Sequence, residues 1–287
     1  MSDSSISPPP APASAFDVIV VGGGQAGLAV AYHLSRRGLR YLVLDSGTEI
    51  GQAWRGRWDS LRLFTPAEYC SLPGMPFPAP AGTYPTKDQV ADYLQSYATT
   101  FELPVLLNAA VRRLTHDGHV FHLETSQGSL FAHQVVVATG PFQRPVAPAM
   151  AQQFAADVVQ QHSSEYARPS DVPQGRVLVV GAGNSGLQIA AELATTRELH
   201  VAVGSKQTMV PQRPFGRDLF WWLSKTRLLS RSADSRAARF LRRKGGDLVI
   251  GTSNHSRGSC QRCSQLISLQ HSNRASTRRF DGCCATG

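Results

Sequence analysis

Residues Phe16 to Gly27 read F-D-V-I-V-V-G-G-G-Q-A-G, and this stretch decides the fold. The apolar run from Val18 to Val21 is typical of a strand that is buried on both faces. Glycines spaced G-x-G-x-x-G follow it, and the apolar-rich run from Leu28 to Arg37 predicts a helix behind them. A strand, a glycine turn and a helix in this order present free helix N–H groups to a pyrophosphate. The stretch therefore predicts a dinucleotide site.

The residues after this helix complete the pattern. Gly38 can end the helix, Tyr41 to Leu44 predict a second strand, and Asp45 follows that strand. An acidic residue about 20 positions beyond the glycines binds a ribose diol in such sites. A glycine-rich turn in an unrelated α/β domain is the alternative interpretation. The residues that we expect to bind this dinucleotide are Gly22, Gly24, Gln25, Ala26, Gly27 and Asp45.

The same pattern recurs about 160 residues later, as an internal repeat. Arg176 to Val180 predict a strand, a second G-x-G-x-x-G begins at Gly181, and Leu187 to Thr195 predict a helix. His200 to Val203 predict the next strand, which ends in Gly-Ser-Lys without an acid. A basic residue in that place accommodates a 2′-phosphate, which favours NADP over NAD.

The two fingerprints thus differ in the charge that follows the second strand. Asp45 after the first suits FAD, whereas a base after the second suits NADPH. Lys206 and Arg213 are the candidate bases, although each of them alone can also be a solvated surface cation. Together the fingerprints predict an α/β fold with two doubly wound, Rossmann-like domains.

The chain is long enough for two domains, and its charge is unevenly spread. Its 287 residues can bury sizeable cores. Residues 1–205 hold 13 Lys and Arg against 16 Asp and Glu, whereas residues 206–287 hold 16 against 4. A basic tail can bind nucleic acid or an anionic membrane. We prefer a solvated or out-of-frame end, so no nucleic-acid partner is predicted.

The sequence favours a cytoplasmic protein. Residues 1–15 are rich in Ser, Pro and Ala, which predicts disorder, and they lack the basic start and apolar run of a signal peptide. No apolar run is long enough to cross a bilayer, so no transmembrane segment is predicted. Only Cys70 of the five cysteines precedes residue 254, which indicates a reducing compartment without a disulfide framework.

Two aromatic segments invite different interpretations. Residues 54–58 read W-R-G-R-W, in which Trp54 can cover a planar anionic cofactor and Arg55 can bind its phosphates. A packed loop with solvated arginines is the alternative. The run from Asp218 to Leu229 predicts a helix that lines the substrate side or packs on the second domain. A membrane surface is the alternative for this helix.

Further motifs point to a known family. They are G-Q-A-W-R from Gly51, T-Y-P-T-K-D-Q-V-A-D-Y-L from Thr83, V-V-V-A-T-G-P-F-Q from Val135 and H-S-S-E-Y from His162. With the two fingerprints, they resemble the class B flavin-dependent monooxygenase superfamily, in particular bacterial FAD/NADPH oxidoreductases similar to plant YUCCA-type enzymes. The resemblance runs from about Phe16 to about Gly251.

The resemblance implies a function and further site residues. NADPH would reduce FAD, and the reduced flavin with O₂ would deliver one oxygen atom to a soft heteroatom or a carbonyl compound. Trp54 and Arg55 would pack on the flavin side, and Ala138, Thr139 and Gly140 would cross back to the second domain. No acid or nucleophile is implied, so the catalytic residues are unknown. The residues implied for NADPH are Gly181, Gly183, Asn184, Ser185, Gly186 and Lys206.

The predicted organisation and partners follow from these motifs. We expect a small-molecule substrate and O₂ as partners, with a homodimer as a possible assembly. The predicted segments are a disordered start over 1–15, an FAD-binding domain over 16–145, a linker and NADPH-binding domain over 146–253, and a basic, Ser- and Cys-rich, unstructured tail over 254–287.

Two features depart from the family pattern. The family's linker has a glycine four residues before its histidine, whereas Val158 holds that place before His162. A reductase, an oxidase or a redox sensor is therefore an alternative to the monooxygenase. After about Ser253 the expected return to the FAD domain is lost, and we hypothesise a truncated or frame-shifted end. The FAD domain would then be incomplete, and an inactive nucleotide-binding remnant is a further alternative.

The tail also contains most of the cysteines, but no metal site is predicted there. Zinc sites need ligands at fixed spacings in a supporting fold, and this spacing matches no standard pattern. A redox dithiol is disfavoured because such pairs in disulfide reductases lie inside a dinucleotide domain. The residues concerned are His255, Cys260, Cys263, His271, Cys283 and Cys284.

Overall fold

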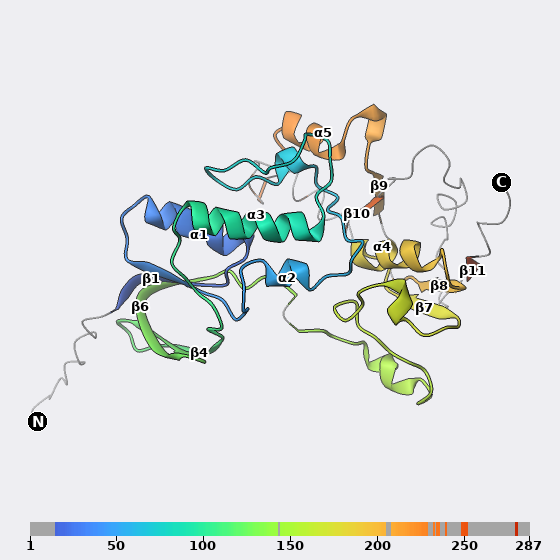
Figure 1. The fold of residues 1–287 in the computed structure, drawn as a ribbon, viewed down its shortest axis with the longest axis horizontal. Helices are drawn as coiled ribbons and strands as arrows, with labels where there is room; N and C mark the ends of the chain where they lie inside the picture. The colour runs from blue at the N-terminus through green and yellow to red at the C-terminus, as the bar shows by residue number, and fades with distance from the viewer. Residues whose placement is uncertain are drawn as a thin grey trace, which may run out of the picture. The chain divides into compact units, whose positions relative to one another are not determined.

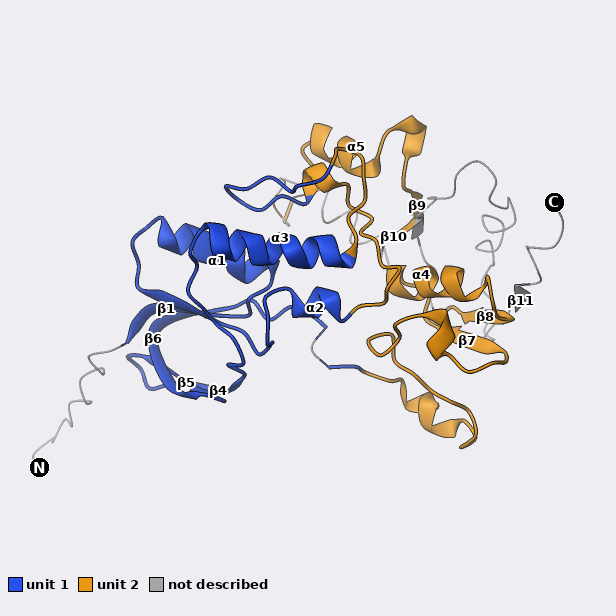
Figure 2. Cartoon of the chain, in the orientation of Figure 1, with its two compact units in different colours: residues 1–56, 70–79, 87–145 blue, residues 57–69, 80–86, 146–287 orange. Residues whose placement is uncertain are grey.

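The computed structural model describes residues 15–142, 144–204, 208–228, 232, 234–235, 239, 248–251 and 279–280. The chain divides into two compact units, each built from separate stretches (Figure 2). Unit 1 comprises residues 1–56, 70–79 and 87–145, and unit 2 comprises residues 57–69, 80–86 and 146–287. Unit 2 therefore contains the segments 57–69 and 80–86 together with the second fingerprint. A single boundary at residue 145 would assign these two segments to the first domain.

The described part of unit 1 forms a six-stranded sheet with three helices (Figure 1). Its strands are β1 (Phe16–Val21), β2 (Tyr41–Leu44), β3 (Val105–Leu106), β4 (Val111–His116), β5 (Phe121–Thr125) and β6 (Gly128–Val137). Its helices are α1 (Gln25–Ser35), α2 (Gln52–Arg55) and α3 (Lys87–Thr100). Helix α1 begins at Gln25 rather than at the predicted Leu28, because Gly24 is its N-cap and the fingerprint itself forms the first turn.

The sheet has the strand order β3-β2-β1-β6-β5-β4. Its first four strands are parallel, and Val20 of β1 lies beside Val43 of β2 and Val136 of β6. Strands β4, β5 and β6 form an antiparallel meander. The predicted α/β fold with a parallel-rich sheet is therefore confirmed.

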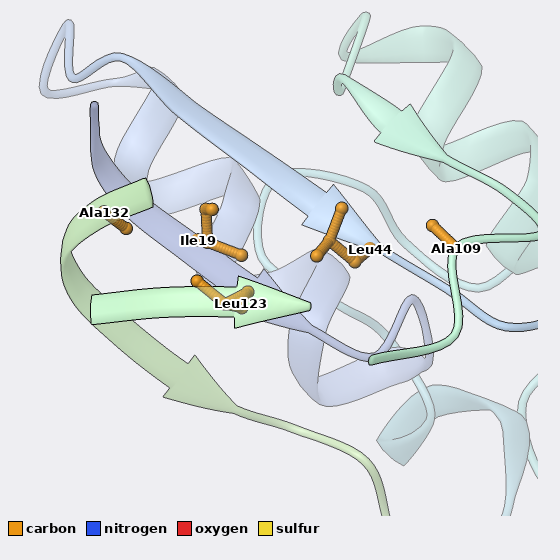
Figure 3. Packing of buried hydrophobic residues seen from close by; sticks show 5 residues of the cluster. All are labelled: Ile19, Leu44, Ala109, Leu123 and Ala132. Atoms are coloured by element: carbon orange, nitrogen blue, oxygen red, sulfur yellow. The ribbon is translucent and has the colours of Figure 1, made fainter. Parts of the chain in front are cut away.

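Different layers cover the two faces of β1. Val20 faces α1, since a Cβ at Gly27 would lie 3.4 Å from its side chain. Ile19 points to the opposite face, where it joins a buried cluster with Leu44, Ala109, Leu123 and Ala132 (Figure 3). Leu123 and Ala132 belong to the meander, so the second layer of this unit is β-structure. A doubly wound fold would place helices on this face, whereas the structure has strands of the meander there. Parallel strands need cover on both faces, and the meander supplies it.

Helix α3 also fixes a long irregular segment of unit 1. The Tyr97 hydroxyl donates a hydrogen bond to the Pro73 carbonyl oxygen at 2.7 Å. The Tyr93 hydroxyl donates to the Met75 carbonyl oxygen and accepts from the Leu72 N–H, both at 2.7 Å. Both tyrosines are buried, so these bonds satisfy polar groups inside the core.

The described residues of unit 2 form two small sheets. Strand β7 (Val177–Val180) is parallel to β8 (Leu199–Ala202), β11 (Arg279–Phe280) is antiparallel to β8, and β9 (Thr208–Pro211) is parallel to β10 (Leu248–Gly251). The helices within the described residues are α4 (Asn184–Leu193) and α5 (Leu219–Lys225). Short 3₁₀ turns lie at Ala67–Tyr69, Ala149–Gln153, Pro169–Asp171 and Pro214–Gly216.

The second fingerprint folds as its repeat predicts. Helix α4 follows β7 through the glycine turn and begins at Asn184, three residues before the predicted Leu187, because Gly183 is its N-cap. The predicted aromatic helix is α5, whose N-terminus is capped by Asp218. The predictions for residues 1–14 and for nearly all of 254–287 lie outside the described residues.

Candidate functional site

The turn after β1 has the close packing that a dinucleotide fingerprint needs. Gly22 has a φ of +112°, and a Cβ there would overlap the carbonyl oxygen of Ala138. A Cβ at Gly27 would overlap the carbonyl oxygen of Gly22. Both positions therefore require glycine, which lets β1, α1 and the end of β6 approach one another.

The N-terminus of α1 is open to an anion. Gly24 is the N-cap, no side chain caps the helix, and its first turn holds no acidic residue. A Cβ at Gly24 would meet no protein atom within 4 Å, and Gln25 and Ala26 beside it are exposed. The first helical hydrogen bond runs from the Leu28 N–H to the Gly24 carbonyl oxygen. The earlier amides and the helix dipole thus suit a phosphate group.

Asp45 is fixed beside this turn. Its Oδ2 accepts a hydrogen bond from the Gly23 N–H at 2.6 Å, and its Oδ1 accepts from the Gly47 N–H at 2.7 Å. A carboxylate has about four lone-pair sites, so two backbone donors leave room for a diol. The structure therefore brings the predicted acid and the predicted glycines together.

The end of β6 joins the same edge of the sheet. The Ala138 N–H donates to the Val21 carbonyl oxygen at 2.8 Å. A Cβ at Gly22 would lie 3.1 Å from Cα of Thr139, and Gly140 has a φ of +72°. The A-T-G segment thus closes one side of the first glycine turn.

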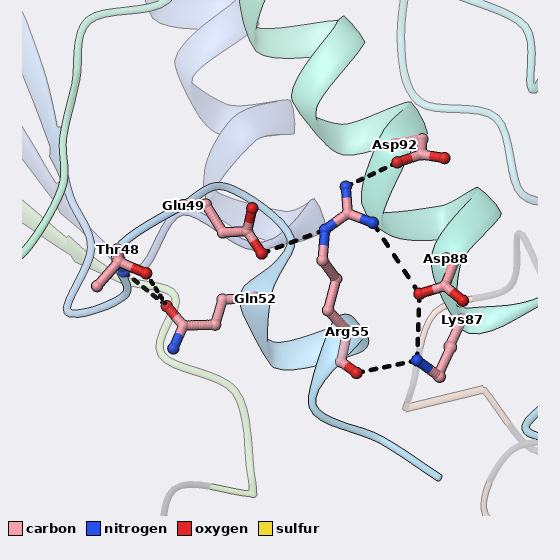
Figure 4. A network of polar contacts seen from close by, with 7 residues as sticks. All are labelled: Thr48, Glu49, Gln52, Arg55, Lys87, Asp88 and Asp92. Carbon is pink, nitrogen blue, oxygen red and sulfur yellow. Dashed lines mark hydrogen bonds and ion pairs between the residues drawn. The ribbon is translucent and has the colours of Figure 1, made fainter. Parts of the chain in front are cut away.

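Arg55 lies among carboxylates, which sequence reasoning missed (Figure 4). Its Nη2 is 2.7 Å from Asp92 Oδ1, and its Nε is 3.2 Å from Glu49 Oε1. The hydrogen bond with Asp92 is the main cause that raises the pKa of Arg55. Lys87 donates from Nζ to the Arg55 carbonyl oxygen at 3.0 Å and lies 3.1 Å from Asp88. The guanidinium is therefore engaged on the α3 side, and Trp54 beside it is half-buried.

The second turn reproduces the first. Gly181 has a φ of +104°, and a Cβ at Gly186 would overlap its carbonyl oxygen. Gly183 caps α4 without any side-chain cap, and a Cβ there would meet no atom within 4 Å. Asn184 Oδ1 accepts a hydrogen bond from the Ile250 N–H at 3.0 Å, whereas Ser185 is exposed. Unit 2 thus contains the same glycine turn before an uncapped helix N-terminus.

The two candidate bases for the 2′-phosphate have different outcomes. Lys206 lies outside the described residues. Arg213 is exposed, its Nη2 is 3.5 Å from the Gly82 carbonyl oxygen, and its guanidinium lies 5.9 Å from the ring centre of Tyr84. A hydrogen bond with Tyr84 is the main cause that raises the pKa of Arg213. Arg213 therefore carries a full charge on an accessible surface.

Sequence reasoning also missed a polar cluster in unit 2. Gln212 is buried, and it donates from Nε2 to the carbonyl oxygen of Phe64 and to the carboxylate of Asp218. The Tyr84 hydroxyl donates a hydrogen bond to the same carboxylate, and nothing in the motif that begins at Thr83 indicates this contact. Only the fold reveals the pair.

The described residues contain neither a membrane-crossing helix nor a metal site. No described helix is long and apolar enough to span a bilayer. No described group of three or more His, Cys, Asp and Glu is placed to hold a metal ion. The tail residues considered for zinc or a dithiol lie outside this part of the chain.

Known proteins match this arrangement. The family model described as pyridine nucleotide-disulphide oxidoreductase matches residues 19–224. An uncharacterized CzcO-like oxidoreductase of Geobacillus kaustophilus is 44% identical over 235 residues, which is 82% of this chain and 67% of the relative. The probable indole-3-pyruvate monooxygenase YUCCA4 of Arabidopsis thaliana is 35% identical over 208 residues, which is 70% of this chain and 50% of the relative. The chain thus spans about half the length of this plant relative.

Solved structures of flavin-dependent monooxygenases have a similar fold. A flavin-containing monooxygenase from Stenotrophomonas maltophilia matches with a TM-score of 0.67 and 33% identity, over 83% of this chain and 70% of that one. A steroid monooxygenase described as oxidized and bound to NADP matches with a TM-score of 0.55 and 25% identity, over 76% of this chain and 44% of that one. The predicted resemblance to flavin-dependent monooxygenases is confirmed.

Proposed function

Because the chain belongs to the pyridine nucleotide-disulphide oxidoreductase family, we propose that it is an FAD- and NADPH-dependent oxidoreductase of the flavin monooxygenase type. The proposed reaction transfers one oxygen atom from O₂ to a small organic substrate. One observation carries the proposal, namely that the same glycine turn before an uncapped helix N-terminus is built twice, with an acid after the first. The family membership and the flavin monooxygenases above support FAD and NADPH as the cofactors.

In the proposed first site, the chain binds and orients FAD. The amides of Gln25, Ala26 and Gly27 would bind the pyrophosphate, since the α1 N-terminus has no side-chain cap. Asp45 would bind the ribose diol with the lone pairs that Gly23 and Gly47 leave open.

Other residues of this site have a less direct role. Ala138, Thr139 and Gly140 would close one wall, while Trp54 would supply a flat face. For Arg55 we propose an indirect role, because Glu49 and Asp92 already bind its guanidinium.

In the proposed second site, the chain binds NADPH. Gly181, Gly183 and Gly186 would let the pyrophosphate approach α4, and the Ser185 hydroxyl is exposed beside that N-terminus. Asn184 would position the start of α4 through its bond to Ile250. Lys206 and Arg213 would bind the 2′-phosphate, and the accessible charge of Arg213 supports this role. When bound, the two cofactors supply hydride transfer to flavin and the reaction of reduced flavin with O₂.

The visible absorption spectrum tests this proposal. Purified protein is mixed with FAD, freed of unbound FAD, and treated with NADPH without air and then with air. We expect a retained flavin spectrum that bleaches with NADPH and returns in air, with NADH much less effective. A colourless folded protein that retains no FAD would contradict the proposal and favour a nucleotide-binding remnant.

A second candidate function is an NADPH-driven flavin reductase or oxidase without oxygen insertion. One observation favours it, because Val158 replaces the linker glycine of the family and is 46% exposed. The following His162 accepts the Ser164 N–H at its Nδ1, so the retained half of that motif is still ordered as a turn. Measuring hydrogen peroxide against NADPH consumed separates the two functions, since full uncoupling with every candidate substrate would identify a reductase or oxidase.

Three further predictions concern the location, the assembly and the substrate of this chain. They are a cytoplasmic location, a homodimer, and the use of a small organic substrate by this chain. The cytoplasmic location is supported by the single Cys70 in the first 253 residues. Light scattering of the purified protein would test the homodimer.

A further inference from the structure

Tyr84 connects an accessible cation to a buried polar cluster. Its hydroxyl has one hydrogen, which it donates to Oδ2 of Asp218 at 2.7 Å, so its oxygen can only accept from any further partner. The exposed guanidinium of Arg213 is such a partner, and its carbon lies 5.9 Å from the centre of the Tyr84 ring. The hydrogen bond between them is the main cause that raises the pKa of Arg213. The carboxylate at one end thus turns the Tyr84 oxygen into an acceptor for the guanidinium at the other.

The backbone that carries this guanidinium is fixed by the same cluster. Gln212 directly precedes Arg213, is buried, and donates from Nε2 to Asp218 and to the Phe64 carbonyl oxygen, both at 2.9 Å. The Gln212 carbonyl oxygen also accepts from the Leu219 N–H at 2.9 Å. Arg213 is therefore held both where its side chain begins and where it ends.

The strands of unit 2 bring Arg213 toward the second glycine turn. Val210 on β9 lies beside Ile250 on β10, and the Ile250 N–H donates to Oδ1 of Asn184, the first residue of α4. Arg213 follows Val210 by three residues, which span at most about 11 Å of extended chain. A long cationic side chain in this place suits a phosphate on the ribose of a nucleotide that is held at the N-terminus of α4.

Holding the guanidinium in advance favours binding of such a phosphate. An exposed arginine ordinarily samples many rotamers, and immobilising one flexible side chain weakens binding by roughly twofold to tenfold. The contacts of Arg213 with Tyr84 and with the Gly82 carbonyl oxygen, which lies 3.5 Å from Nη2, reduce this cost. A guanidinium has five N–H donors, so these two contacts leave donors for a phosphate.

We propose that Tyr84 is a positioning residue that holds Arg213 for the 2′-phosphate and thereby contributes to the preference for NADPH over NADH. In this assignment Tyr84 does not touch the cofactor, because it acts through the guanidinium. The inference rests on the proposed binding of NADPH at the second glycine turn, and it adds a residue that determines the specificity of that site.

Nucleotide binding tests the proposal without any flavin chemistry. Isothermal titration calorimetry of the full 287-residue chain compares NADP⁺ with NAD⁺, and adenosine 2′,5′-bisphosphate with AMP. We expect the wild type to bind the 2′-phosphorylated member of each pair more tightly. Tyr84→Phe should lose about threefold to tenfold of this preference, while the affinity for NAD⁺ and AMP stays unchanged.

Tyr166→Phe is the matched control. Tyr166 is also buried in unit 2, and its hydroxyl donates to a carboxylate oxygen of Glu192 at 2.8 Å. Both variants should be less stable in urea, whereas only Tyr84→Phe should change the preference for the 2′-phosphate. A preference that falls equally in both variants, or in neither, would overturn the proposal.

Substitutions of the exposed Arg213 provide a second test, which does not require Tyr84→Phe to fold. Arg213→Gln should abolish the preference, and adding Tyr84→Phe to it should have no further effect on the preference. Arg213→Lys keeps the charge but loses the planar guanidinium, so it should lose part of the preference. An Arg213→Lys variant equal to the wild type would overturn the proposal, since charge alone would then suffice. A wild-type chain that binds NADP⁺ no better than NAD⁺ would instead refute the proposed NADPH site, and the positioning role with it.

Discussion

The Tyr84 hydroxyl donates a 2.7 Å hydrogen bond to Oδ2 of Asp218, which lies 134 positions later in the chain. The same oxygen accepts from Nε2 of Gln212 at 2.9 Å, and Oδ1 caps α5 through the Phe220 N–H at 2.8 Å. Gln212 also donates to the Phe64 carbonyl oxygen at 2.9 Å. Asp218 and Gln212 together therefore join the segments of unit 2 that contain Phe64, Tyr84 and α5.

Removing the Tyr84 hydroxyl should destabilise unit 2. Tyr84→Phe keeps the ring but leaves Asp218 without one donor, and hydrogen bonds to charged groups contribute about 1.5–3 kcal/mol. We expect the free energy of unfolding in urea to fall by about that amount. A double-mutant cycle with Asp218→Asn isolates the pair from the capping of α5. Additive losses in the two single variants would show that the pair is not coupled.

Two neighbouring glycines should respond differently to alanine. Gly27→Ala places a methyl group on the Gly22 carbonyl oxygen and should destabilise unit 1, whereas Gly24→Ala projects into open space. We expect Gly24→Ala to keep the thermal midpoint of the apo-protein but to weaken FAD retention about tenfold or more, because its methyl group points toward the proposed phosphates. Gly183→Ala is the matched control and should weaken NADPH binding alone. Equal FAD retention by wild type and Gly24→Ala would contradict this site.

Asp45 should affect both folding and flavin retention. Asp45→Asn presents an amide N–H₂ group to either the Gly23 or the Gly47 N–H, so one backbone donor loses its acceptor. We expect a loss of about 1–3 kcal/mol in stability and weaker FAD binding. Fluorescence titration with FAD and with NADPH checks the assignment, since the NADPH affinity should be unchanged. A parallel loss for NADPH would indicate a general folding defect.

Substituting Arg55 distinguishes a structural role from a role in binding the phosphates of FAD. Its ion pairs with Glu49 and Asp92 lie near the surface, where such pairs contribute about 0–1 kcal/mol. If Arg55 only holds α2 to α3, Arg55→Gln should shift the thermal midpoint slightly and leave FAD retention intact. If the guanidinium also binds phosphate, FAD affinity should fall with a strong salt dependence. We expect the first result, and equilibrium dialysis at two ionic strengths decides it.

Tyr97 should make stability depend on alkaline pH. Burial raises the pKa of Tyr97 from 10.0 to about 12 in the folded protein. The folded state therefore holds this proton more tightly than the unfolded state, so its contribution is complete below pH 10 and is lost as the pH rises toward 12. The free energy of unfolding should decrease by up to about 1.4 kcal/mol per pH unit in that window. Tyr97→Phe should flatten the profile, and an unchanged slope would assign it to other groups.

Most of the fold was predictable from local sequence patterns. The apolar runs, the glycine spacing and Asp45 identified β1, α1, β2 and the second βαβ repeat, because these features act within a few residues of one another. The helix starts were displaced by three residues in both repeats, at Leu28 and Leu187. Because glycine lowers helix propensity, the sequence predicts that each helix begins after the last glycine of its turn. In the structure Gly27 and Gly186 lie inside the helices, where they pack closely against the turn.

The rest depended on contacts between distant segments. Nothing in the W-R-G-R-W motif indicates that Arg55 meets Asp92 on α3, and nothing near Tyr84 indicates Asp218. The sequence also does not predict that a meander rather than a helix covers Ile19. An apolar strand needs a covering layer, but its sequence does not specify whether that layer is helical or β-structure. The family and the two strand–glycine turn–helix units were predictable from local sequence motifs alone. The pairing of Arg55 with Asp92 and of Tyr84 with Asp218 follows from the folded structure, because it depends on how segments far apart in the chain pack.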